Sequence, residues 1–60
     1  MNKEIIIVTR NGDKFTFRRE VAEEIMENIY TDDCGLIYFG NNRLILPKDN
    51  FSYYWVNEVD

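Results

Sequence analysis

The sequence predicts a small α+β domain in the order ββαβββ, with an antiparallel sheet and one amphipathic helix packed on one face of that sheet. Three observations support this prediction. Short β-branched and aromatic runs are separated by turn residues, the residues after Arg18 repeat their apolar side chains with a helical period, and the chain has only 60 residues. We therefore expect a single domain that spans residues 1–60.

The first two strands are predicted to form a hairpin. Residues 5–8 are all β-branched, and residues 14–18 alternate polar and apolar side chains. Asn11-Gly12, which lies between them, is a strong signal for a two-residue hairpin loop. With this loop two pairs share the face under the helix, Val8 with Phe15 and Ile6 with Phe17.

A helix is predicted from about Arg19 to Tyr30, because apolar and acidic side chains separate onto opposite sides at helical spacing. No serine, threonine or asparagine stands where an N-cap is expected. Gly35 can adopt a left-handed conformation in the turn that follows the helix. The apolar stripe consists of Val21, Ala22, Ile25, Met26 and Ile29.

Three more strands are predicted after the helix. Residues 36–39 and 43–46 flank the turn residues Gly40-Asn41-Asn42, and Pro47 closes the second of these strands. The last strand starts at Phe51 and is rich in aromatic residues. Strict alternation assigns three of its side chains to the helix-covered core, namely Phe51, Tyr53 and Trp55.

The opposite face of the predicted sheet is also apolar. One helix covers one face, so the other would expose a patch larger than a soluble monomer normally shows. A small barrel could hide this face, but a helix already occupies the side that a barrel would turn inward. We therefore expect a homo-oligomer, most simply a two-fold dimer. The predicted self-association residues are Ile5, Ile7, Leu36, Tyr38, Ile45, Tyr54 and Val56.

Residues suited to catalysis or metal binding are scarce in this sequence. There is no histidine, Ser52 is the only serine, and Cys34 is the only cysteine. The pair Asp32-Asp33 before Cys34 lacks the regular oxygen spacing of a calcium loop and is typical of a turn. We therefore expect a protein that is not an enzyme and that holds no cofactor and no metal.

The charge pattern points to a protein partner. The net charge of -4 disfavours broad affinity for nucleic acid or for an anionic membrane. A column of carboxylates on the helix could fit a basic groove in a host or regulatory protein, although a solvated helix exterior gives the same pattern. The column consists of Glu20, Glu23, Glu24, Glu27, Asp32 and Asp33.

The basic residues define an alternative function, a nucleic-acid or nucleotide-binding module that uses the first hairpin. Phe15 and Phe17 are interleaved with the basic residues, but alternation directs these rings to the face opposite the charges. The alternative nucleic-acid-binding residues are Arg10, Lys14, Arg18 and Arg19.

The lone cysteine and the absence of a signal peptide or an apolar span predict a cytoplasmic protein. In its length and acidity the chain resembles the small accessory proteins of bacteriophages and mobile elements, many of which bind and inhibit a host protein. Taken together, these features predict a non-catalytic protein-interaction module that self-associates through an apolar sheet face. A partner would bind at the acidic helix.

Overall fold

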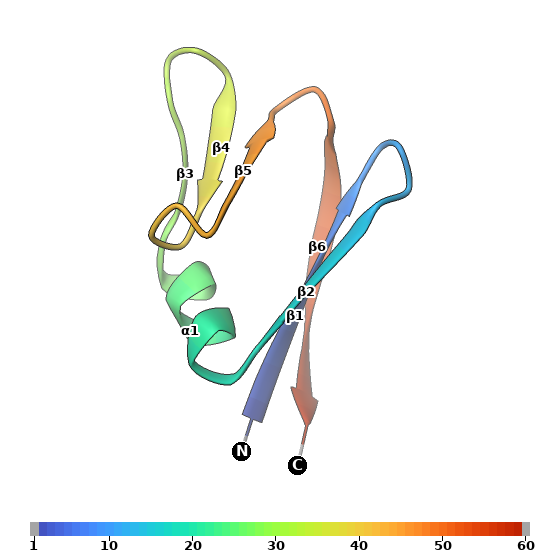
Figure 1. The fold of residues 1–60 in the computed structure, drawn as a ribbon, viewed down its shortest axis with the longest axis vertical. Coiled ribbons are helices and arrows are strands. Elements are labelled where there is room, and N and C mark those ends of the chain that lie inside the picture. Colours follow the sequence, from blue (N-terminus) through green and yellow to red (C-terminus); the bar gives the residue numbers. More distant parts are fainter. Residues whose placement is uncertain (1, 60) are drawn as a thin grey trace.

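The computed structural model describes residues 2–59 and contains six strands and one helix (Figure 1). In chain order the elements are β1 (Asn2–Thr9), β2 (Lys14–Arg18), α1 (Arg19–Glu27), β3 (Ile29–Thr31), β4 (Leu36–Phe39), β5 (Leu44–Pro47) and β6 (Phe51–Val59). This order confirms the α+β class and the single helix between the second strand and the strands that follow. The short strand β3 is an addition to the predicted elements.

The strands form two antiparallel sheets of three strands each. Sheet A has the order β2-β1-β6 and sheet B the order β3-β4-β5. The sequence predicts antiparallel pairing but not this division. The chain leaves β5 at Pro47, turns through Lys48–Asn50, and then pairs along the whole of β1. The first and last strands of the chain are therefore neighbours, with Asn2 opposite Val59.

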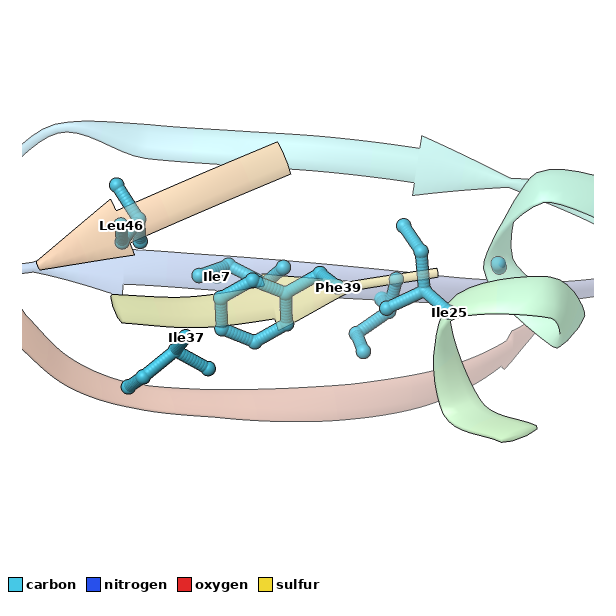
Figure 2. Close-up of a cluster of buried hydrophobic side chains, with 7 residues drawn as sticks. Ile7, Ile25, Ile37, Phe39 and Leu46 are labelled. Atoms are coloured by element: carbon cyan, nitrogen blue, oxygen red, sulfur yellow. The ribbon is translucent and has the colours of Figure 1, made fainter. Parts of the chain in front are cut away.

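The hydrophobic core lies between sheet A and a second layer made of α1 and sheet B. Figure 2 shows side chains from α1, β4 and β5 gathered over Ile7 of β1. The Cα atoms span 37 × 23 × 12 Å, and in Figure 1, which is viewed along the shortest of these dimensions, the two layers lie side by side. The buried cluster consists of Ile5, Ile7, Ala22, Ile25, Ile37, Phe39 and Leu46.

The register of the β1–β2 hairpin differs by one residue from the predicted register. Ile7 lies opposite Phe15 and Ile5 opposite Phe17. A slip of one residue moves every side chain of a strand to the other face. Ile5 and Ile7 are therefore completely buried in the core, and their predicted place on an exposed self-association face is wrong.

The cause of the shifted register is a longer loop. The connection contains residues 10–13, rather than Asn11-Gly12 alone. Thr9 N–H donates to the Asp13 carbonyl at 2.9 Å, and the buried Thr9 Oγ1 accepts the Asp13 N–H at 3.1 Å. With these two bonds Asp13 pairs with Thr9, whereas a two-residue loop would pair it with Arg10, so the register shifts by one residue.

Helix α1 ends earlier than predicted, at Glu27 instead of Tyr30. The chain leaves the helix at Asn28, whose carbonyl accepts the Gly40 N–H at 2.7 Å, and then enters β3. At the other end Arg18 has extended backbone and makes no capping hydrogen bond with its side chain. This open start agrees with the missing N-cap residue in the sequence.

The face assignments in sheet B agree with the predicted hairpin. Alternate residues of β4 and β5 point into the core, and the residues between them point outward. The loop between the two strands contains residues 40–43, with positive φ angles at Gly40 and Asn42. The inner residues are Ile37, Phe39, Leu44 and Leu46, and the outer residues are Leu36, Tyr38 and Ile45.

Candidate interaction surfaces

Large exposed apolar side chains concentrate on the last strand. Among the described residues six large hydrophobic side chains are exposed, and four of them are consecutive on β6. These four are Tyr53, Tyr54, Trp55 and Val56, with relative exposures of 51%, 45%, 37% and 40%. We call them the β6 surface. Exposed aromatic side chains concentrated along one strand are typical of a protein-binding site.

A bulge sets the direction of these side chains. Thr9 lies opposite Phe51, whereas the neighbouring Val8 lies opposite Tyr53, so Ser52 is an extra residue in β6. The bulge interrupts the alternation of the strand. As a result Phe51 and Tyr53 lie on opposite faces of sheet A.

The aromatic rings therefore separate differently from the predicted pattern. Phe51 packs in the core, with its ring centroid 5.8 Å from that of Phe39. Tyr53 and Trp55 stack on each other on the outer face, at 5.7 Å and an interplanar angle of 22°. The core assignment is thus correct for Phe51 and wrong for Tyr53 and Trp55. The β6 surface includes both faces of the strand, since Tyr54 lies opposite Ile7.

The outer face of sheet A combines aromatic and basic side chains. Ile6 and Val8 of the central strand β1 lie in the middle of this face, and each is only 6% exposed. Tyr53 and Trp55 of β6 lie on one side of these two residues, and the side chains of β2 lie on the other. We call this surface the open face of sheet A. It contains Glu4, Ile6, Val8, Lys14, Thr16, Arg18, Tyr53, Trp55 and Asn57.

One ion pair crosses the open face. Arg18 Nε donates to Glu4 Oε2 at 2.7 Å, and this hydrogen bond lowers the pKa of Glu4. Asn57 Nδ2 donates to the other oxygen of Glu4 at 3.5 Å. Exposed pairs of this kind contribute little to stability. The pair does, however, neutralise part of the positive charge on this face.

The four predicted basic residues do not form one cluster. Lys14 and Arg18 lie on the open face, whereas Arg10 is in the hairpin loop and Arg19 begins α1. The predicted separation of charges from Phe15 and Phe17 is correct, because both rings pack against the core. The aromatic residues that share a face with Lys14 and Arg18 come instead from β6.

The outer face of sheet B carries a second aromatic group. Tyr30 and Tyr38 stack with ring centroids 4.8 Å apart and an interplanar angle of 11°. Ile45 lies opposite Tyr38 and is exposed. The remaining predicted self-association residues do not share one face. Leu36, Tyr38 and Ile45 lie on the outer face of sheet B, whereas Tyr54 and Val56 lie opposite Ile7 and Ile5 on the core-facing side of sheet A, so their predicted place on the outer face is wrong.

Asp32 fixes the position of Tyr38. Its Oδ1 accepts the N–H groups of Cys34 and Leu36, both at 2.9 Å, and its Oδ2 accepts the Tyr38 hydroxyl at 2.7 Å. The bonds from Leu36 and Tyr38 lower the pKa of Asp32, because they stabilise the carboxylate. Asp32 is therefore a structural residue of the turn before β4.

The same hydrogen bond raises the pKa of Tyr38 to about 12. We expect one of the four tyrosines to titrate near that value when the absorbance of tyrosinate is measured after a rapid pH jump. The stabilisation from this bond is complete below the unfolded tyrosine pKa of about 10 and is lost as the pH rises through about 12.

Asp32→Asn removes the acceptor charge and should lower the pKa of Tyr38. Asp33→Asn is the matched control, because the structure shows no bond between Asp33 and Tyr38. If both variants titrate as the native protein does, the Asp32–Tyr38 bond is absent in solution.

The predicted acidic residues on and after α1 do not form one column of free carboxylates. Glu20, Glu23 and Glu27 are exposed, whereas Glu24 accepts hydrogen bonds from Arg43 at 3.1 and 3.2 Å. Asp32 and Asp33 lie beyond β3, so they do not continue the helical column. The free carboxylates on the helix are thus fewer than the sequence suggests.

One concave site of the structure lies beside the start of α1. A shallow depression of about 210 Å³ is lined by Asn2, Lys3, Arg19, Glu20 and Glu23. Pockets that enclose a small molecule usually have volumes of about 300–1,000 Å³. Within residues 2–59 no three cysteine, aspartate or glutamate side chains are grouped so that they could hold a metal ion. Over the same range, no helix has the length and apolar character needed to cross a membrane.

Three comparisons with known proteins give no relative. No protein family, curated protein or solved structure matches this chain. The geometry of the surfaces is therefore the basis for a functional proposal.

Proposed function

We propose that this chain is a non-catalytic protein-interaction module that self-associates through the β6 surface. The observation that supports this proposal is the concentration of exposed side chains at Tyr53, Tyr54, Trp55 and Val56. Aromatic side chains give a large contact area for a small loss of conformational entropy and are enriched in binding hot spots. A small domain also gains stability when a second copy covers such residues.

A partner protein with a basic groove would bind the module at the exposed carboxylates of α1. These are Glu20, Glu23 and Glu27, which are not held by Arg43. Electrostatic complementarity of this kind mainly increases the rate and the specificity of association. Regulation or inhibition of such a partner in the cytoplasm, as in the phage accessory proteins, is the biological role that we propose. An exposed free thiol at Cys34 suits that compartment.

Light scattering after size exclusion tests self-association directly. As the concentration rises, the measured mass should approach twice 7.2 kDa. Tyr54→Ser should weaken the dimer about tenfold, because it removes a hot-spot ring. Tyr30→Ser is the matched control, since Tyr30 is similarly exposed but lies on sheet B. A native protein that remains monomeric at high concentration would contradict the proposal. The opposite order of the two variants would move the interface to sheet B.

A second function, binding of single-stranded nucleic acid, is favoured by one observation. Lys14 and Arg18 share the open face with the stacked rings of Tyr53 and Trp55. Bases stack on exposed aromatic side chains while nearby cations contact phosphates. The net charge of -4 opposes such binding.

Fluorescence of Trp55, the only tryptophan, provides the test of this second function. A single-stranded oligonucleotide at low salt should quench it, and Lys14→Gln should lower the slope of log affinity against log salt by about one. Arg19→Gln, a change outside the open face, should alter the slope less. No quenching at low salt would eliminate nucleic-acid binding on this face.

A further inference from the structure

We propose that the free edge of β6 pairs in antiparallel orientation with β6 of a second copy, so that the two A sheets become one continuous six-stranded sheet. This inference rests on the self-association proposed above and specifies its geometry. It concerns the backbone of β6 as well as its side chains. Such pairing supplies hydrogen bonds from the main chain and specificity from the alternating side chains.

The four sheet edges of the described structure differ in their protection. At the edge of sheet A, β2 has five residues and carries Lys14 and Arg18. In sheet B, β3 has three residues and β5 ends at Pro47. Short length, basic side chains and proline all oppose pairing with another chain. β6 has nine residues, with neither a basic residue nor a proline. It is thus the edge best suited to accept another strand.

The hydrogen bonds of β1 show which groups of β6 are free. Thr9 N–H bonds to Asp13 on the side of β2, and Arg10 N–H bonds to Asn50 on the side of β6. Successive residues of a strand direct their backbone groups to opposite sides, so the even-numbered residues of β1 bond to β6. Their partners there are Tyr53, Trp55 and Asn57.

The intervening residues Tyr54, Val56 and Glu58 must therefore direct their N–H and C=O groups away from β1. Sheet A contains no strand on that side of β6, and the described backbone hydrogen bonds outside the ladders involve none of these three residues. The free edge thus presents a regular row of donors and acceptors. Its side chains at Tyr54 and Val56 are themselves about half exposed.

A second copy matches this row when Trp55 lies on the two-fold axis. Trp55 is the central residue of Phe51–Val59, so this register gives the two strands their longest overlap, with regular pairing over residues 53–57 between the two bulges. Tyr54 then lies opposite Val56 of the second copy, and this aromatic and β-branched pair occurs twice. Each Glu58 lies opposite an uncharged Ser52, and the two acidic ends are far apart. The edge is therefore complementary to itself in its hydrogen bonds, its shape and its charge.

Disulfide trapping tests the register in full-length protein that also carries Cys34→Ser. Trp55 directs its backbone to β1, so Trp55 and its copy would form a non-hydrogen-bonded pair with Cα atoms about 4.5 Å apart, which a disulfide can bridge. Under mild oxidation Trp55→Cys should give a covalent dimer. Tyr53→Cys, on the same face, should remain monomeric under denaturing conditions, because Tyr53 lies opposite Asn57 of the second copy. The reverse result would overturn the proposed register.

A proline variant tests the edge without removing Trp55. Val56→Pro deletes an outward N–H and leaves the β1 ladder intact, as proline does on natural edge strands. It should weaken the dimer at least about tenfold, whereas Val56→Thr, which keeps the N–H and the β-branch, should change it less. Circular dichroism confirms that each variant is folded. If folded Val56→Pro dimerises as tightly as the native protein, edge pairing is wrong.

The two proposals fail in different ways. A native chain that stays monomeric contradicts self-association itself and, with it, the edge pairing. A native dimer that tolerates Val56→Pro, or that is not trapped at position 55, contradicts only the edge pairing. In that case self-association through the side chains of the β6 surface would stand.

Discussion

Replacing Phe39 by alanine is expected to unfold much of the protein at room temperature. Phe39 lies on β4 in the second layer and is fully buried over Ile7 of β1 (Figure 2). Its ring packs against that of Phe51. Removing a large buried ring usually costs about 3–5 kcal/mol of unfolding free energy. A chain of this length has a total stability of about 3–9 kcal/mol, so the loss is a large fraction of the total. Urea denaturation followed by circular dichroism measures the effect.

Tyr53→Ala is the matched control for this experiment. Its ring is half exposed and stacks on Trp55, so the loss should be about 0.5–1.5 kcal/mol. Equal losses at the two positions would mean that Tyr53 belongs to the core. The strand would then follow the strict alternation predicted from its sequence, without the bulge at Ser52.

Gly40→Ala should be the second most damaging change. Gly40 has a φ angle of +68°, and an added Cβ would lie 3.0 Å from Ile25 Cγ1 and 3.2 Å from Arg43 Cγ. The left-handed backbone costs about 1–2 kcal/mol for an L-residue. Overpacking against the buried Ile25 adds about 1–3 kcal/mol. We therefore expect the unfolding free energy, measured in urea, to fall by about 2–5 kcal/mol.

Gly12→Ala separates these two causes. Gly12 also has a positive φ angle, +89°, but nothing lies within 4 Å of the position of an added Cβ. Only the backbone cost of about 1–2 kcal/mol should remain. If Gly40→Ala and Gly12→Ala lower the unfolding free energy equally, the contact of an added Cβ at residue 40 with Ile25 has no energetic consequence.

The sequence predicts the elements of this fold well, because most of them have a local signal. The helical spacing of Ala22 and Ile25 places both residues in the core. In β4 and β5 the alternation is regular, and each predicted face agrees with the structure. The stop of α1 near Asn28 is less predictable. Ile29 continues the helical stripe in sequence but pairs with Phe39 in a strand.

The faces of β1 could not be predicted from its own residues. Residues 5–8 are all apolar, so they contain no alternation, and only the assumed loop length set their direction. The bond from the Asp13 N–H to the Thr9 hydroxyl oxygen holds a longer loop, and this loop reverses the assignment. Both faces of the strand are in fact buried, since Ile6 and Val8 are 6% exposed on the open face.

The candidate site was predicted only in part. Tyr54 and Val56 are exposed, but the bulge at Ser52 exchanges the two faces of the strand, so they lie on the core-facing side of sheet A while Tyr53 and Trp55 lie on its outer face. Nothing local in the sequence identifies a bulge or shows that β6 pairs with β1. That pairing joins the two most distant strands of the chain, so it depends on the complete fold.

The pairing of β1 with β6 also determines how the chain can fold. Sheet B is built from β3, β4 and β5, which are neighbours in sequence, and its loops close at small entropic cost. Sheet A is complete only when Asn2 meets Val59. Contacts between such distant residues slow folding, so the docking of β6 should be the late, rate-limiting event. Until then the most apolar run of the chain, residues 5–8, has a bare edge, and aggregation competes with folding in this interval.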